Sequence, residues 1–114
     1  MKTILIVVPD LFFSTRIEET AKRLGYQVAA PNIGEKIDSA IARTGAVLVV
    51  VSLDVPNAPE VIATARRANA RTLAFGSHRN VELFTAAREA GCDQVVARSL
   101  MDSDLPKLLL KWAG

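Results

Sequence analysis

The sequence is poor in the residues that form disulfides or bind metals. It contains one cysteine, Cys92, and one histidine, His78, among 114 residues. A single cysteine cannot form a disulfide within the chain and favours a reducing compartment, so we expect a cytoplasmic protein. The same scarcity offers no ligand set for a zinc site. A chain of this length buries roughly two-thirds of its unfolded surface, so it needs neither device to fold.

Long apolar runs and the common catalytic motifs are also missing. The apolar run near the start, residues 4–8, is too short to cross a membrane, and no cleavage site of small residues follows it. We therefore expect no membrane association. Neither G-x-G-x-x-G nor the P-loop pattern occurs, so no motif favours nucleotide binding. The absence of G-x-S-x-G argues against a hydrolase built on Ser52 and His78.

No single sign of charge dominates the chain. Fourteen basic and twelve acidic residues are interspersed, which leaves a net charge of +2. Nucleic-acid binding calls for a basic patch on one face, and the nearest approach to one is Arg66, Arg67 and Arg71. We interpret these three as a solvated helix face, with a phosphate-binding surface as the alternative. We expect no DNA partner.

What the chain does contain is a regular alternation of apolar runs and segments of helical period. Five short runs, rich in β-branched residues, predict buried strands at 4–8, 26–30, 46–51, 72–75 and 94–97. Five segments predict helices at 11–24, 35–44, 57–69 and 80–90, and after a cap at Asp102 or Ser103. Such alternation predicts right-handed crossovers and a parallel sheet covered on both faces. We predict one α/β domain over residues 1–114, with a five-stranded, doubly wound sheet.

Polar residues gather where these strands end, which is where such sheets place their chemistry. Asp10 follows the first strand and is best explained as the N-cap of the first helix. Backbone amides near the start of the fourth helix, with arginines beside them, suit an anion. A small-molecule or anion sensor would draw on Ser52, Asp54, Ser77, His78, Arg79 and Arg98.

Four motifs, in this order and spacing, resemble the response-regulator receiver domain, the phospho-accepting module of two-component signalling. They are KTILIV, RLGYQV, VVVSLDVP and AREAGCDQVVARS, and the resemblance covers roughly residues 2–112. It implies a CheY-like, flavodoxin-like three-layer sandwich. In that family two acidic residues after the first strand hold Mg²⁺, and an Asp ending the third strand accepts the phosphoryl group. A Thr or Ser ends the fourth strand, and a Lys ends the fifth.

The chain departs from this pattern at every one of those positions. Val8 and Pro9 stand at the acidic pair, with Asp10 one place later, and Ser52 stands at the acceptor, four residues before Pro56. The hydroxyl position falls on Gly76 and the lysine position on Arg98. The resemblance therefore implies a pseudo-receiver: no catalytic residue, no metal, no Mg²⁺ and no aspartyl phosphorylation. An acceptor role for Asp54 is the less favoured alternative.

The resemblance also implies how such a protein acts. Receiver output runs through the face of the fourth helix, fifth strand and last helix, which here draws on Val81, Phe84, Arg88, Val95, Ala97, Leu110 and Trp112. The sequence ends at Gly114 with no helix-turn-helix motif after this domain. We therefore expect a stand-alone module that binds another protein as an adaptor, or forms a homodimer.

Overall fold

Five parallel strands form one sheet in the computed structural model, which describes residues 1–114. The spatial order is β2-β1-β3-β4-β5, so the direction of winding reverses beside β1. The strands are β1 (Thr3–Val7), β2 (Gln27–Ala29), β3 (Leu48–Ser52), β4 (Arg71–Gly76) and β5 (Gln94–Ala97). This confirms the predicted fold class, and each strand lies within two residues of its predicted bounds. In sheets of this order, ligands bind at the carboxyl ends of the strands beside the reversal.

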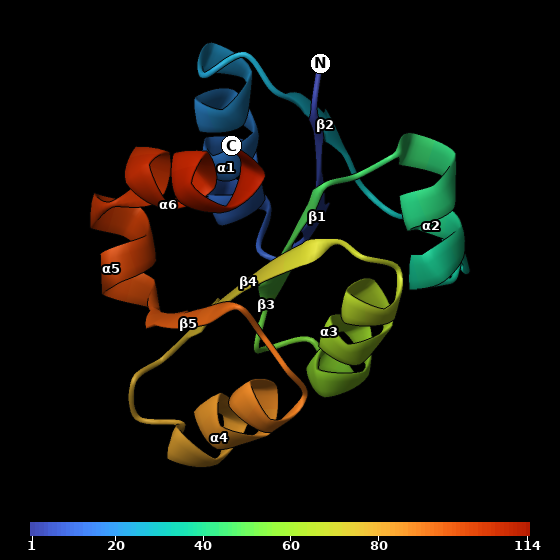
Figure 1. Cartoon of the computed structure of the whole chain (residues 1–114). Helices are drawn as coiled ribbons and strands as arrows, with labels where there is room; N and C mark the ends of the chain where they lie inside the picture. The colour runs from blue at the N-terminus through green and yellow to red at the C-terminus, as the bar shows by residue number, and fades with distance from the viewer.

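Six helices cover the sheet in two layers (Figure 1). One layer holds α1 (Leu11–Arg23), α5 (Arg98–Ser103) and α6 (Leu105–Ala113), and the other holds α2 (Ile37–Thr44), α3 (Ala58–Arg67) and α4 (Val81–Glu89). The fold is therefore the predicted three-layer sandwich. None of the helices has the length and apolar character that a membrane span requires.

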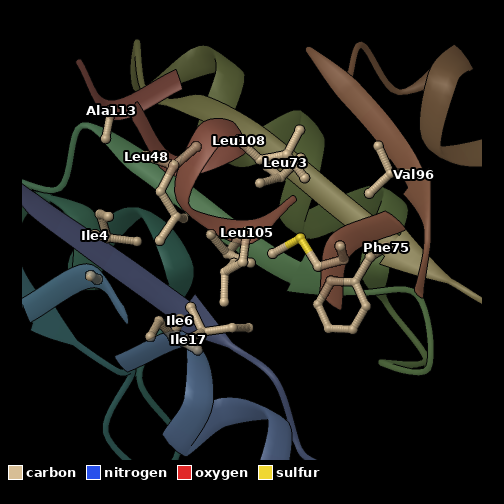
Figure 2. Close-up of a cluster of buried hydrophobic side chains, with 14 of the residues drawn as sticks. Ile4, Ile6, Ile17, Leu48, Leu73, Phe75, Val96, Leu105, Leu108 and Ala113 are labelled. Carbon is tan, nitrogen blue, oxygen red and sulfur yellow. The ribbon is translucent and has the colours of Figure 1, made fainter. Parts of the chain in front are cut away.

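Both faces of the sheet are buried, which explains why its central strands are apolar at consecutive positions. Ile4, Ile6 and Leu48 point toward the α1, α5 and α6 layer, where they pack with Ile17, Leu105 and Leu108 (Figure 2). The alternate residues Leu5, Val49 and Val51 pack against α2, α3 and α4. Because side chains alternate along a strand, each layer of helices has its own core.

The predicted helix ends are largely correct. Asp10 caps α1 as expected, because its Oδ1 accepts a hydrogen bond from the Phe13 N–H at 3.1 Å. Gly45 ends α2 in the left-handed region, at φ 67°, and its N–H bonds to the Ile41 carbonyl. Asn80 stands at the N-cap of α4, but its side chain makes no capping hydrogen bond there.

The prediction for the last helix is wrong. Neither Asp102 nor Ser103 caps it, because residues 98–103 already form the separate helix α5, and α6 begins after Asp104. Met101 anchors α5 in the core with no exposed surface. Pro106 lacks an N–H and its ring would crowd the preceding turn, so one continuous helix through this point would be kinked or broken, whereas the first turn of α6 tolerates it.

Candidate functional site

Ser52, the residue at the predicted acceptor position, ends β3 beside the reversal of strand order. Its side chain is only 4% exposed and lies on the same face of the sheet as its register partner Phe75. Ser52 Oγ accepts a hydrogen bond from the Asp54 N–H at 3.2 Å. The hydroxyl therefore stabilises the turn that leaves the strand, as serine side chains often do.

The structure brings Asp10 and Arg98 together from opposite ends of the chain. Asp10 Oδ2 accepts a hydrogen bond from Arg98 Nη2, while Oδ1 caps α1. The Phe13 N–H lowers the pKa of Asp10, and the Arg98 guanidinium lowers it further. The same guanidinium lies 4.8 Å from the centre of the Phe13 ring. Both carboxylate oxygens of Asp10 are thus occupied, one by Arg98 and one by the start of α1, and Arg98 in turn lies against Phe13 of α1.

Apolar side chains fill the space around these residues. Phe13 and Phe75 stack with ring centres 4.8 Å apart. Leu53 is 4% exposed and lies over Gly76, so a Cβ at position 76 would stand 3.0 Å from the Leu53 Cβ. The hydroxyl-bearing residue of the receiver pattern therefore does not fit at Gly76 without displacing Leu53.

The other candidate anion contacts lie on the surface. Asp54, Ser77, His78 and Arg79 are all exposed, and Ser77 Oγ accepts a hydrogen bond from the Arg79 N–H at 3.3 Å. Arg79 lines a small hollow along the first turn of α4. No hollow in the molecule is lined by Ser52, Ser77 or Arg98. No three His, Cys, Asp or Glu side chains are grouped as metal ligands.

The predicted interaction residues surround β5 on both sides of the sheet. On α4, Val81 is 68% exposed, while Phe84 is half-buried with Arg88 lying 5.7 Å from its ring centre. Val95 and Ala97 of β5 are half-buried. Leu110 of α6 is 50% exposed, but the half-buried Trp112 donates a hydrogen bond to Gln94 Oε1 at 2.8 Å.

Sequence reasoning missed two features of this edge. Leu53 and Phe75 close the site, yet both look like ordinary core residues in the sequence. Leu11 and Phe12 are 76% and 89% exposed at the start of α1. The exposure of Leu11 and Phe12 could have been predicted from helical spacing, because only Phe13 falls on the buried face of the helix.

Solved structures with the same architecture include receiver domains of response regulators. A signal receiver domain of a response regulator from Bermanella marisrubri matches with a TM-score of 0.79 at 18% identity, over 98% of each chain. A LuxR-family, DNA-binding response regulator from Staphylococcus aureus matches with a TM-score of 0.81 at 15% identity, over the whole of both chains. The chain has the receiver-domain fold. Neither a protein-family model nor a curated protein sequence matches it.

A third receiver domain sharpens the contrast at the strand ends. It comes from a sensor histidine kinase of Pseudomonas aeruginosa, matches with a TM-score of 0.79 at 18% identity over 99% of this chain and 98% of its own, and has magnesium coordinated in its active-site cleft. In our structure the residues after β1 are Val8, Pro9 and Asp10. Only Asp10 has a carboxylate, and that carboxylate is bonded to Arg98 and Phe13.

Proposed function

We propose that this receiver-fold protein signals without aspartyl phosphorylation, by contact with another protein or with a second copy of itself. The proposal rests on the burial and hydrogen bonding of Ser52. An acyl phosphate requires a carboxylate, whereas Ser52 offers a 4% exposed hydroxyl that already accepts a hydrogen bond from the Asp54 N–H. No base is bonded to this hydroxyl to activate it as a nucleophile instead.

The electrostatics of the edge support the same proposal. Phosphoryl transfer depends on cations that neutralise charge on the transferring oxygens, and Mg²⁺ is held by several hard oxygen ligands. Asp10 is the one carboxylate after β1, and Arg98 is bonded to it. A guanidinium at that carboxylate repels a divalent cation. The donor set therefore does not fit Mg²⁺, and we infer that this protein works without it.

Asp54 is the remaining acceptor candidate, and its position argues against that role. Asp54 is exposed in the turn after β3, beyond the buried end of the strand. The end of β1 brings it no free metal ligand, because Val8 and Pro9 have no carboxylate and that of Asp10 is bonded to Arg98 and Phe13. We propose that Asp54 serves the turn alone.

Contact with a partner is supported by apolar side chains left exposed on the helices that flank β5. Val81 and Leu83 of α4 are 68% and 37% exposed, and Leu100 of α5 is 41% exposed. Such exposed apolar groups are available for contact with another protein. A non-enzymatic adaptor or a homodimer fits these features.

Intact-mass measurement tests the absence of phosphorylation. The protein is incubated with Mg²⁺ and acetyl phosphate, and its mass is compared with that of the Asp54→Ala and Ser52→Asp variants. We expect no phosphoryl group on the wild type or on either variant. Ser52→Asp stays unmodified because it restores the acceptor carboxylate without the metal ligands. A Mg²⁺-dependent gain in the wild type that Asp54→Ala abolishes would refute the proposal.

A further inference from the structure

The opposite end of the sheet collects basic residues that are scattered in the sequence. Because the strands are parallel, the helices between them run in the reverse direction, and their C-termini lie near the amino ends of the strands. Cations are favoured in the last turn of a helix by its dipole. Such last-turn cations occur in five helices, as Lys22 and Arg23, Arg43, Arg66 and Arg67, Arg88, and Lys111. Helix polarity thus concentrates positive charge at one end of the molecule.

Two adjoining hollows lie at this end, with volumes of about 330 and 390 Å³. Asn69 and Arg71 line both of them. Lys2, Lys111 and Trp112 complete the polar lining of the first, and Arg66 and Asp93 that of the second. Four cations therefore face the two hollows together with a single side-chain carboxylate. We call this pair of hollows the basic end.

Arg66 presents the most available charge in the basic end. It is exposed, and its guanidinium takes part in no hydrogen bond or ion pair within the protein. Its guanidinium lies against Gly91, where an added Cβ would stand 2.2 Å from Arg66 Nη1. Gly91 has φ 95°, a region that favours glycine, so the backbone there keeps this place open for the arginine.

Each of the other cations has a polar partner within the protein, and Lys111 Nζ donates a long, 3.4 Å hydrogen bond to Gln94 Oε1. Arg71 Nη1 lies 3.7 Å from Asp93 Oδ1, and the second oxygen of Asp93 accepts a 2.8 Å hydrogen bond from the Thr72 N–H. Lys2 Nζ donates to the Gly114 carbonyl oxygen at 2.7 Å. Asp93 thus partly neutralises Arg71 and the Gly114 oxygen engages Lys2, so the positive balance of the basic end rests chiefly on Arg66 and Lys111.

Trp112 forms a fixed wall of the first hollow. Its indole N–H is bonded to Gln94, and Arg71 and Lys111 lie 6.0 and 4.9 Å from its ring centre. Cations near an aromatic face are attracted to it, which keeps both charges at the rim of the hollow. Trp112 is also the only tryptophan in the chain, so its signals report on this site alone.

We propose that the basic end docks an acidic segment of a partner protein. The inference rests on the proposed function in that the partner is a protein. Carboxylate side chains match the separate guanidinium groups of Arg66 and Arg71, since arginine binds carboxylates in a bidentate manner. Asp93 disfavours the continuous phosphates of a nucleic acid, which call for a longer basic stripe than four cations around two hollows.

A titration with hexaglutamate peptide tests the proposal, with Trp112 fluorescence and the indole N–H resonance as readouts. We expect both signals to saturate at low salt and the affinity to fall as salt is added. Arg66→Glu should weaken binding about tenfold, because it replaces an attraction by a repulsion. Arg23→Glu is the matched control: it makes the same change in the last turn of α1, lines neither hollow, and should change the affinity less than about twofold.

Further variants and ligands test for other occupants of the basic end. Arg66→Gln should weaken binding less than Arg66→Glu, and thermal unfolding confirms that each variant is folded. An unresponsive Trp112, or an equal loss in Arg23→Glu, overturns the proposal. So does tighter binding of oligothymidylate than of hexaglutamate, or self-association that Arg66→Glu abolishes. The titration contains no phosphodonor, so a phosphoryl adduct in the mass test refutes the proposed function and leaves this result standing.

Discussion

Gly76→Ala tests whether Leu53 closes the strand-end site. Gly76 ends β4, is buried, and pairs in register with Ala97. An added methyl group would meet Leu53 Cβ at 3.0 Å and Cδ1 at 3.1 Å. Contacts this short require Leu53 to move, and Leu53 is itself packed into the core formed with α2, α3 and α4. We therefore expect Gly76→Ala to destabilise the protein.

The magnitude follows from two opposing effects. Inserting a methyl group into a well-packed core costs roughly 1–3 kcal/mol. Replacing glycine where φ is not positive restricts the unfolded chain, which stabilises by about 0.4–1 kcal/mol. The packing cost is the larger of the two, so the free energy of unfolding should fall by about 1 kcal/mol. With an unfolding entropy of about 2.1 cal/mol/K per residue over 114 residues, Tm should fall by about 4 °C.

Urea and thermal unfolding of a double-mutant cycle measure this effect. Leu53→Gly removes the whole side chain that the new methyl group would meet, Cβ included, so Gly76→Ala should cost nothing in that background. The coupling between the two substitutions is then about 1 kcal/mol, which is within reach of such cycles. A neutral Gly76→Ala in the wild type, or the same cost in both backgrounds, would show that Leu53 does not close the site.

Two further changes test the core and the surface. Met101 is fully buried and anchors α5, so Met101→Ala should cost about 3 kcal/mol in urea unfolding. Leu100→Ala, at a 41% exposed neighbour, should stay within about 1 kcal/mol, and equal losses would contradict the burial of Met101 in the core. Hydrogen bonds from Arg43 and the Asn32 N–H lower the pKa of Glu35 from 4.5 to about 2. Because this pKa falls on folding, the stabilisation is present above 4.5 and lost as pH falls toward 2. Urea midpoints should therefore drop over that range, less steeply in Glu35→Gln; parallel profiles would contradict the assignment.

The architecture could be predicted from the sequence because local patterns of apolar and capping residues determine it. Buried parallel strands require apolar residues on both faces, and residues 48–51 satisfy that without any tertiary information. Asp10 before an apolar-periodic segment is a local capping signal, and it was interpreted correctly. The division of the last helix was missed, although Pro106 marked it. What that local signal could not show is the tertiary contact that holds α5 in place, the burial of Met101 in the core.

The candidate site depended on contacts that no local pattern contains. Residue identity at Ser52, Gly76 and Arg98 indicated that the receiver pattern is altered. It did not indicate that Arg98 turns to Asp10, which is 88 positions away in the chain. The basic end was foreseen only in part: the sequence singled out Arg66 and Arg71, whereas helix polarity and chain topology bring Lys2 and Lys111 to the same end.

The most direct test of the central claim uses beryllofluoride, which forms a stable phosphoryl-like adduct with a carboxylate that has Mg²⁺ beside it. Acyl phosphates hydrolyse, so this stable analogue complements the mass measurement. Amide NMR spectra are recorded before and after adding Mg²⁺ and beryllofluoride. We predict that the resonances of Ser52, Asp54, Gly76 and Arg98 do not move. Shifts that concentrate at these residues and require Mg²⁺ would contradict a phosphorylation-independent receiver fold.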